Sequence, residues 1–531
     1  MSVADRRRRK FEVTRSRRRA DSLFTFCSAR ELAGTLCQVH HVTMGDEEAS
    51  LRLQASVSGL ADRVPVVSAR SLLSTGQRRT LIGVAVFIVI GLILATLTTL
   101  IILVSIVTAL YITLVWYRFR LFLRSTRADV VVAVSDEEAR SVRDEELPMY
   151  TVLVPAYHEP EVIGHLLEHL GRVEYPKDRL EILLLVEADD SETIGAIGDA
   201  DPGRQFELVF VPPSEPRTKP KALNYGLSLA KGELITVYDA EDIPDPLQLR
   251  RAVVGLARLG DSFACLQAKL SYHNPTQNLI TKWFTIEYAM WFSFFLPGLA
   301  AIQAPIPLGG TSNHFRRSVL RSMGAWDPFN VTEDADLGVR MAREGYNIGV
   351  LESVTYEEAN SDFVNWVRQR SRWYKGYLQT FVVHSRAPRR LIDEVGWRGA
   401  INFFLFVGGT PVLALLNPIF WSMCLLWFVV HPEFIKSLFP APVYYVGMLS
   451  WAFGNFLLVY LTVISCRLIR HGELFVAALL VPIYWVMMSI AAVKAAWQLV
   501  TQPAHWEKTF HGLSPARASV LLSNPTSSVQ P

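Results

Sequence analysis

The sequence concentrates three carboxylates in the stretch 331–336. Glu333, Asp334 and Asp336 repel one another, so a fold keeps such acids together when they share a proton, a metal ion or a substrate. The same residues also suit the start of a helix, where Thr332 would cap the first turn and the acids would interact favourably with the helix dipole. The stretch alone leaves both interpretations open.

Polar side chains also follow three predicted strands. The apolar runs 149–155, 181–186 and 233–238 have the length and composition of buried strands. The candidate residues at their ends are Pro155, Tyr157 and Glu159, then Asp189 and Asp190, then Asp239, Glu241 and Asp242. Because ligands bind beyond the carboxyl ends of parallel strands, we expect these side chains to share one site.

A basic segment before the predicted strand 233–238 contributes Lys219 and Lys221. Carboxylates with lysines nearby suit a diphosphate and a divalent cation, and hard oxygen ligands select Mg²⁺ or Mn²⁺. Simpler interpretations exist for each cluster. The Asp189–Asp190 pair suits a helix cap, the lysines suit solvated surface charge, and the last acidic cluster suits a turn.

Two downstream motifs offer groups for a phosphate and a sugar. A glycine-rich segment around Gly310 and Thr311 would let the backbone approach a ligand closely. Further on come Gln369, Arg372 and Trp373. Arg372 supplies a planar fork suited to phosphate, and Trp373 a flat apolar face suited to a sugar ring. An ordinary glycine turn and an Arg/Trp-rich helix at a membrane interface are the alternatives.

The elements that would position these groups belong to an α/β domain at residues 128–390. Its near-continuous apolar strands, with a further one at 207–211, alternate with helical patterns such as 161–172 and 221–231. This alternation indicates a parallel sheet with helices on both faces.

The composition is too apolar for an ordinary soluble protein. Of the 531 residues 50% are hydrophobic and 19% charged, and the mean hydropathy is +0.23. The run 81–117 contains no charge, and since one span needs about 20 residues, it holds two spans that turn near 96–99. This hairpin is placed at 78–120. Basic residues flank both of its ends, which predicts a cytosolic position for the domain that follows.

Three more apolar stretches form a region of transmembrane and interfacial helices at 399–501; they are 400–430, 442–466 and 474–500. Glycine and proline breaks in the first, and Lys494 in the last, leave room for an extra crossing or an interfacial helix. The aromatic-rich segment 283–299 is either an amphipathic helix on the inner leaflet or buried core.

The N-terminal region 1–77 is predicted to be poorly ordered or only locally helical, and 502–531 form a C-terminal tail. Nine basic residues among the first 20 favour anionic lipid as a partner over nucleic acid, since no reading motif accompanies them. The five cysteines form no CxxC pair, which argues against a disulfide framework or a zinc site.

As an ordered set, the motifs resemble those of the processive, membrane-integrated family 2 glycosyltransferases, which include cellulose, hyaluronan and chitin synthases. The matching residues lie within 151–379 and are Asp189 and Asp190, Asp239 to Asp242, Thr332 to Asp334, and Gln369 with Arg372 and Trp373. The resemblance implies a cytosolic GT-A-type (Rossmann-like) α/β catalytic domain combined with a multi-span α-helical transmembrane region in the plasma (inner) membrane. It also implies inverting transfer from a nucleotide-diphosphate sugar, UDP-glucose or similar.

The resemblance implies a role for each matching residue. Asp334 would be the general base, supported by Glu333, with Asp336 behind them and Thr332 as the cap that holds Asp334. The donor would be held by Pro155, Tyr157, Glu159, Asp189, Asp190, Lys219, Lys221 and Asp239. The diphosphate and the acceptor would be held by Gln369, Arg372, Trp373, Gly310 and Thr311. Mg²⁺ or Mn²⁺ would be held by Asp239, Glu241 and Asp242. Glu241 stands where the family has a second Asp, so the acid that touches the metal stays open.

We therefore expect a processive β-glycan synthase that elongates a polysaccharide from a cytosolic nucleotide sugar and passes it across the bilayer. Its partners would be the sugar donor, the growing polysaccharide and the lipid bilayer, with no nucleic acid. A transferase that adds one sugar to a lipid or short acceptor, and a catalytically silent membrane receptor, are the alternatives. Residues 506–509 resemble a Trp-containing motif near the site of hyaluronan synthases, which predicts a cytoplasmic C-terminus and an even number of crossings after the domain.

Overall fold

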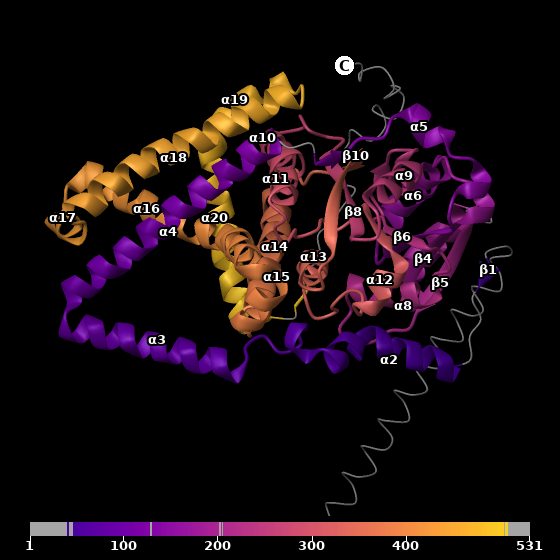
Figure 1. Ribbon diagram of the computed structural model, residues 1–531, viewed down its shortest axis with the longest axis horizontal. Coiled ribbons are helices and arrows are strands. Elements are labelled where there is room, and N and C mark those ends of the chain that lie inside the picture. The colour runs from indigo at the N-terminus through magenta and orange to yellow at the C-terminus, as the bar shows by residue number, and fades with distance from the viewer. Residues whose placement is uncertain are drawn as a thin grey trace, which may run out of the picture.

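A mixed β-sheet lies at the centre of the domain that carries the acidic clusters (Figure 1). The computed structural model describes residues 40–41, 46–127, 130–200, 203, 205–503 and 505–507. The basic arm and most of the predicted C-terminal tail lie outside the described residues. Within them, the α/β fold predicted from the alternation of strands and helices is confirmed.

The sheet has ten strands in the described residues, in the order β1-β5-β4-β3-β6-β9-β8-β10-β2, with β7 paired to β10. Their bounds are β1 His40–His41, β2 Val131–Val132, β3 Tyr150–Ala156, β4 Leu180–Glu187, β5 Phe206–Val211, β6 Leu234–Val237, β7 Ile243–Pro244, β8 Phe263–Tyr272, β9 Asn313–Arg316 and β10 Asn347–Glu357. Pairing is parallel except where β9 joins β6 and β8 and where β7 joins β10.

The register of the central strands explains why the acidic clusters meet. Tyr150 of β3 pairs with Leu180 of β4 on one side and with Leu234 of β6 on the other. The three strands therefore run in the same direction and end at the same edge of the sheet. The residues that follow them, around 157, 189 and 239, are brought together there.

Alternate residues of the strands feed two separate cores, as expected for a sheet covered on both faces. Val152 and Val154 pack with α6 (Pro160–Gly171), α7 (Ser191–Asp199) and α9 (Gln248–Leu259). Leu153 packs on the opposite side with α8 (Lys219–Leu229) and with aromatic side chains from α10 (Leu279–Met290).

The aromatic-rich segment belongs to the buried core, the second of the two interpretations of its sequence. It forms α10, a π-helical turn (Trp291–Phe295) and α11 (Leu296–Ala301). Trp283, Phe284 and Phe292 are 3%, 1% and 3% exposed. The segment packs between the sheet and the apolar helices, so its aromatic rings are covered from both sides.

Within the described residues, five helices are long and apolar enough to cross a membrane. They are α3 (Thr75–Leu94), α4 (Thr96–Ser125), the continuous run Pro388–Val430 that ends in α16 (Gly409–Val430), α18 (Ala441–Leu468) and α20 (Val481–Thr501). The break between α3 and α4 falls at Ala95, next to the turn predicted near 96–99. No residue of α3 is buried, and Phe87 and Leu94 are 78% and 79% exposed.

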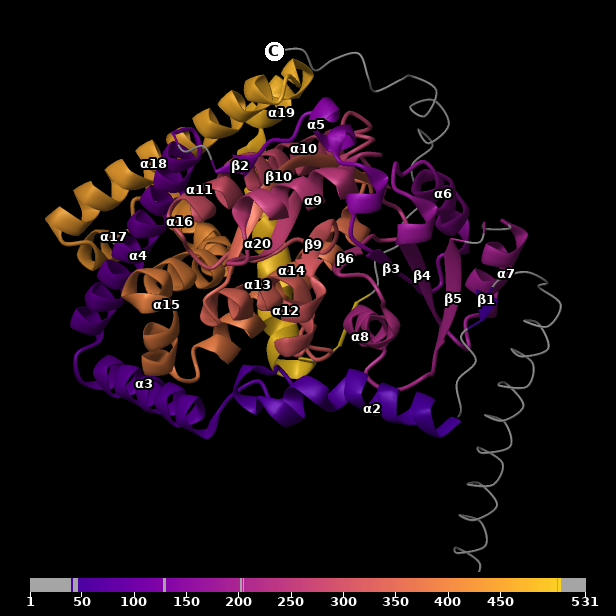
Figure 2. The ribbon, with the colours of Figure 1, turned by 45° about the vertical axis from the view of Figure 1, so that its right-hand side comes forward.

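The last of these helices differs from the others in direction. In Figures 1 and 2, α20 runs beside α14 (Phe363–His384), transverse to α18. Trp366 of α14 donates a hydrogen bond from Nε1 to the hydroxyl of Tyr484 in α20 (3.2 Å). The last apolar helix thus packs along the α/β domain.

Residues 46–72 form a strap across the domain. Its helix α2 (Asp46–Arg63) packs against α8, where Asn224 donates from Nδ2 to the carbonyl of Ser56 (3.0 Å). Asp327 accepts the backbone N–H of Ala69 (2.5 Å), and Arg386 donates to several carbonyls of the strap. These partners lie far away in the sequence, so local composition did not reveal that the strap docks.

The glycine at position 338 permits a close contact that sets the site. A Cβ on Gly338, in α13 (Glu333–Arg343), would lie 2.0 Å from the carbonyl oxygen of Ile306. Because the obstacle is backbone, Gly338→Ala must push α13 away from the segment that leads to Gly310. We expect a loss of about 1–3 kcal/mol in the free energy of unfolding, measured by denaturation of the purified protein.

Gly195→Ala is the matched control for this prediction. Gly195 also lies inside a helix, α7, but a Cβ there has nothing within 4 Å. We expect this variant to be neutral or more stable by roughly 0.5–1 kcal/mol. Equal stabilities of the two variants would contradict the tight contact at Gly338.

Candidate active site

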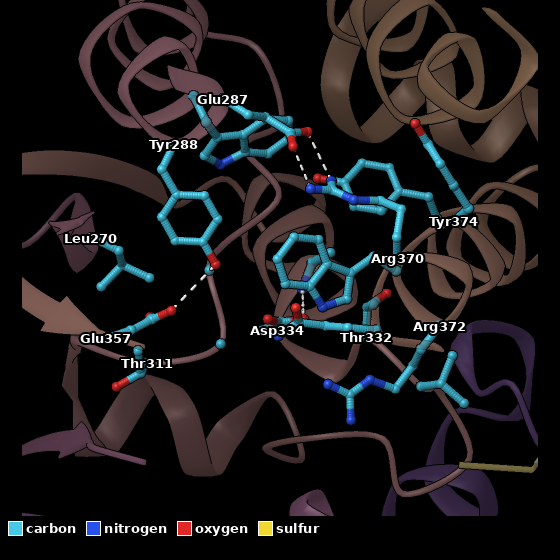
Figure 3. A pocket seen from close by; sticks show the side chains of 18 of the residues that line it. Leu270, Glu287, Tyr288, Thr311, Thr332, Asp334, Glu357, Arg370, Arg372 and Tyr374 are labelled. Carbon is cyan, nitrogen blue, oxygen red and sulfur yellow. Dashed lines mark hydrogen bonds and ion pairs between the residues drawn. The ribbon is translucent and has the colours of Figure 1, made fainter. Parts of the chain in front are cut away.

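A cavity of about 390 Å³ opens at the carboxyl edge of the sheet and continues between the apolar helices. Thirteen of the predicted site residues line it: Pro155, Tyr157, Glu159, Lys219, Asp239, Glu241, Gly310, Thr311, Glu333, Asp334, Gln369, Arg372 and Trp373. Asp189, Asp190, Lys221 and Asp242 lie behind its wall. Figure 3 shows Asp334, Arg370, Arg372 and Glu287 around this space.

The acids Glu333 and Asp334 form the first turn of α13 and face the cavity. Thr332 stands at the N-cap position but makes no capping bond through its side chain, so the predicted cap is wrong. The N–H of Ala335 instead donates to Asp334 Oδ1 (2.7 Å). A Cβ on Gly310 would lie 3.3 Å from Asp334 Oδ2, so the glycine brings the loop close to this carboxylate.

Burial changes the proton affinity of this acidic pair. The pKa of Asp334 is raised to about 6, chiefly because its carboxylate is removed from water, although Lys219 opposes the shift. Burial and the neighbouring charge of Asp334 raise the pKa of Glu333 to about 7. A carboxylate with a pKa near neutrality is suited to accept a proton from a hydroxyl group.

Asp336 points away from the cavity into a buried ionic network. It accepts hydrogen bonds from Arg340 Nε (2.7 Å) and from His384 Nε2 (2.9 Å). Because Arg343 approaches the other ring nitrogen, Nδ1, at 2.8 Å, His384 is a neutral imidazole with its proton on Nε2. Although burial alone would raise it, the pKa of Asp336 is lowered by Arg340 and His384. The network anchors α13 against α14.

The three acids predicted to bind metal are not equivalent. Asp242 is fully buried and turned back into its own turn: Oδ2 accepts the backbone N–H of Asp239 (2.8 Å) and the hydroxyl of Thr311. Burial, followed by the charge of Asp239, holds the pKa of Asp242 well above its ordinary value. Asp242 therefore shapes the turn, and Asp239 and Glu241 line the cavity.

Lys219 is the cation among these acids. Its Nζ lies 2.5 Å from Asp239 Oδ1 and donates to the carbonyl of Gly310 (2.7 Å). Burial alone would lower the pKa of Lys219, but Asp239, Glu333 and Asp334 raise it above its ordinary value. The lysine thus stays charged and joins the end of β6, the glycine loop and α13.

The donor set fits a hard divalent cation that a ligand completes. Among the described residues, no group of three or more His, Cys, Asp or Glu side chains is arranged to hold a metal ion. Mg²⁺ is commonly held by one or two carboxylates together with substrate phosphates and water. Asp239 and Glu241 match that pattern, whereas the oxygens of Asp242 face the turn.

Near Tyr157 and Asp189, the structure adds Arg217 and Glu187 to the predicted residues, and both line the cavity. Arg217 forms an ion pair with Asp189 (2.7 Å) and lies 3.4 Å from the hydroxyl of Tyr157. Arg217 directly precedes the predicted basic segment that contains Lys219 and Lys221, and the prediction did not include it. Glu187 is the last residue of β4 and stands in the polar cluster that also holds Asp189 and Asp190, although no role was predicted for it.

Asp190 and Lys221 support the wall on this side. Asp190 is 1% exposed and accepts the N–H of Thr193 (3.2 Å) and of His158 (2.6 Å), so the helix-cap interpretation applies to it. Lys221 is fully buried and pairs with Glu187 Oε1 (2.6 Å). Neither side chain reaches the cavity.

On the opposite wall, α14 presents Gln369, Arg372 and Trp373 to the cavity. Gln369 is oriented by Asn360, whose Nδ2 donates to Gln369 Oε1 (2.8 Å). The guanidinium of Arg372 lies 4.6 Å from the ring centre of Trp506. Trp506 also lines the cavity, so the segment after α20 contributes to the site.

Sequence reasoning missed a second group of cavity residues: Arg118, Glu287, Tyr288, Glu357 and Arg370. Tyr288 donates to Glu357 Oε2 (3.3 Å), and burial, followed by the charges of Asp242, Glu241 and Asp239, raises the pKa of Glu357 well above its ordinary value. Glu287 and Arg370 lie inside stretches already singled out for aromatic and basic content. For Glu357, nothing in the sequence indicated a role in the site, and the residue is distinguished only by its position at the end of β10.

Beyond Trp373 the cavity continues between helices that are apolar enough to cross a membrane. Its polar lining there consists of Tyr111, Arg118, Thr410, Asn417, Asn455 and Thr462. Arg118 donates to the hydroxyl of Thr410 (3.3 Å), and Tyr111 to Asn455 Oδ1 (3.3 Å). Polar side chains are costly in such helices and are usually functional.

Comparison with known proteins shows what the part of the chain around the acidic cavity is similar to. Residues 148–376 match the model of a family described as Glycosyltransferase like family 2. A probable glycosyltransferase of Bacillus subtilis, YdaM, is 26% identical over 394 residues, which cover 68% of this chain and 87% of that protein. A β-monoglucosyldiacylglycerol synthase of Synechocystis is 27% identical over 49% of this chain and 54% of its own.

A probable glucomannan 4-β-mannosyltransferase of Oryza sativa is 25% identical, covering 44% of this chain and 42% of its own. The match thus spans about half the length of the cyanobacterial and rice relatives. The matched region contains the sheet edge, the acidic turn of α13 and the first half of α14. Residues 148–376, which carry most of the cavity's acidic residues, are thus similar to family 2 glycosyltransferases, and the protein is a glycosyltransferase.

Proposed function

We propose that the protein is an inverting, processive glycosyltransferase that elongates a β-linked polysaccharide from a nucleotide-diphosphate sugar and passes it across the membrane. The observation that carries this proposal is the continuity of one cavity. It joins the carboxylates and Lys219 at the sheet edge to polar side chains between α4, α16 and α18. A chain that grows at Asp334 would have a continuous path past Trp373 into those helices.

Asp334 is the proposed general base. A hydroxyl of the acceptor sugar attacks the anomeric carbon, and its proton passes to the Asp334 carboxylate. The new glycosidic C–O bond forms as the bond between the anomeric carbon and the diphosphate oxygen breaks, and the nucleoside diphosphate leaves with the electron pair. Attack and departure occur on opposite faces of the sugar, so the configuration inverts and no covalent enzyme intermediate is needed.

Cationic side chains would stabilise the departing diphosphate. Arg372 and Lys219 line the cavity on either side of the acidic turn. Asp239 and Glu241 would hold a bound Mg²⁺ or Mn²⁺, which supplies positive charge to the leaving oxygens. Tyr157, Glu159 and the Arg217–Asp189 pair would contact the nucleotide end of a donor such as UDP-glucose.

The proposed location is the plasma (inner) membrane, with the catalytic domain in the cytoplasm. Four of the apolar helices, α3, α4, α16 and α18, would cross, and α20 would lie along the interface beside α14. This arrangement gives two crossings before the domain and two after it. It agrees with the contact between Trp506 and Arg372, because residues 505–507 then lie on the same side as the domain.

A single-sugar transfer to a membrane lipid is the second candidate. The name of the Synechocystis relative, a β-monoglucosyldiacylglycerol synthase, favours it, whereas the name of the rice relative favours a polysaccharide product. Product size distinguishes the two. The purified full-length protein is incubated with radiolabelled UDP-glucose, UDP-N-acetylglucosamine or GDP-mannose, and the products are separated by length. We expect long, β-glycanase-sensitive chains; products extended by one sugar would exclude processive synthesis.

Removal of the proposed base tests the mechanism. We expect Asp334→Asn to lower the rate of transfer by about 100- to 10,000-fold, because an amide cannot accept the proton. Donor affinity, measured by calorimetry, should stay close to that of the wild type. Asp393→Asn, an exposed position on α15 (Pro388–Phe403), is the control and should keep full activity. Turnover retained in Asp334→Asn would remove Asp334 from this role.

The raised pKa of Asp334 predicts an acidic limb in the pH profile. The base must be deprotonated, so kcat/KM should fall as the pH drops through about 6 instead of through the ordinary value of 3.8. Below that limb the decrease should approach about tenfold per pH unit. Glu333→Gln distinguishes the contributions of the two acids to the pH profile. If Asp334 is the base, this variant should keep an acidic limb of kcat/KM near pH 6. A profile that stays flat down to pH 4 would contradict the assignment.

A further inference from the structure

We propose that Arg370 is a positioning residue: clamped by Glu287 and Tyr484, it sets the plane of Trp373 against the acceptor sugar. This inference rests on the proposed role of Trp373 as the acceptor platform. The clamp consists of Glu287 from α10, Arg370 from α14 and Tyr484 from α20. The proposed reaction assigns no step to any of these three residues.

Arg370 is buried and is held through both of its terminal nitrogens, while its Nε has no hydrogen-bond partner. Its Nη1 donates to Glu287 Oε1 (2.8 Å) and its Nη2 contacts Glu287 Oε2 (Figure 3). Nη2 also lies 3.3 Å from the hydroxyl of Tyr484. The side chain of Arg370 is 7% exposed and that of Glu287 is 23% exposed. A guanidinium held by both oxygens of one carboxylate cannot rotate freely.

The same guanidinium lies against the indole ring of Trp373. Its central carbon is 4.5 Å from the centre of that ring, closer than to the rings of Phe284 (5.1 Å) and Trp366 (5.6 Å). A cation at this distance is attracted to the ring face. Tyr288 stacks on Trp373 at 6.1 Å with an interplanar angle of 29°. Trp373 is thus supported from within the protein while it lines the cavity.

The clamp also connects the platform to α20. The hydroxyl of Tyr484 donates to Glu287 Oε2 (2.7 Å) and accepts from Nε1 of Trp366 (3.2 Å). Movement of α20 along α14 would therefore break these bonds. The plane of Trp373 therefore depends on the register of a helix outside the glycosyltransferase domain.

An ordinary structural ion pair is the competing explanation, and the protein contains a matched example. Arg343 and Glu394 pair at 2.6 Å with side-chain exposures of 5% and 22%, close to those of Arg370 and Glu287. This second pair joins α13 to α15 and makes no contact with Trp373. Glu394 also pairs with Arg390 (2.7 Å), so Glu394→Gln reports the effect of losing a buried carboxylate that holds two partners away from Trp373.

The experiment compares Glu287→Gln, Arg370→Lys and Glu394→Gln in the full-length protein. Calorimetry measures the affinity for cellotetraose, a saccharide probe, and separately for UDP; thermal denaturation measures stability. We expect Glu287→Gln and Arg370→Lys to weaken cellotetraose binding by about 10- to 100-fold, since a misplaced platform loses alignment, with UDP affinity changed by less than about twofold. Glu394→Gln should lose similar stability and change neither affinity.

The double variant Glu287→Gln/Arg370→Gln guards against misfolding of the single variants, because it leaves no unpaired buried charge. It should fold and still bind cellotetraose weakly. Equal saccharide affinities in Glu287→Gln and Glu394→Gln, or a parallel loss of UDP binding, would overturn the inference. If saccharide binding falls as expected but the wild-type product carries one added sugar, the positioning role stands and processive synthesis falls. If the wild type makes long products but the variants keep the wild-type saccharide affinity, processive synthesis stands and the positioning role falls.

Discussion

The ion pair between Lys219 and Asp239 is the interaction on which the site depends. One half-buried ammonium group contacts the end of β6 and the loop at Gly310, and its charge also acts on the acids of α13. Two acidic segments, the end of β6 and the first turn of α13, can share one cavity because this cation sits between them. Burial of the acidic turn also raises the pKa of Asp334, so packing and acid–base chemistry are connected.

A second set of buried polar contacts holds these groups in position without entering the cavity. Asp242 with Thr311, Asp336 with His384 and Asp190 with two backbone amides each fix one wall. Hydrogen bonds or ion pairs compensate for the burial of these carboxylates, although Asp242 Oδ1 has no hydrogen-bond partner. The acidic clusters therefore divide into side chains that face the cavity and neighbours that face the protein.

The cavity connects the polar site at the sheet edge to the apolar helices. The aromatic segment of α10 and the π-helical turn separates the sheet from α4 and α18, and α14 runs from the catalytic wall to α20. The Arg370 clamp lies where these elements meet. In this arrangement the cavity wall formed by α14 belongs as much to the helical region as to the α/β domain, which supports the proposed exit of the product through the helices.

The sequence by itself determined the α/β alternation, the apolar segments and thirteen of the side chains that line the cavity, because strand periodicity, span length and motif order are local properties. Only the tertiary structure decided that Asp190, Lys221 and Asp242 turn inward, that Thr332 does not cap, and that α20 packs along α14. It also brought Arg217, Glu287, Glu357 and Arg370 to the cavity. Side-chain direction and charge pairing depend on partners up to hundreds of residues away, and local composition carries no record of them.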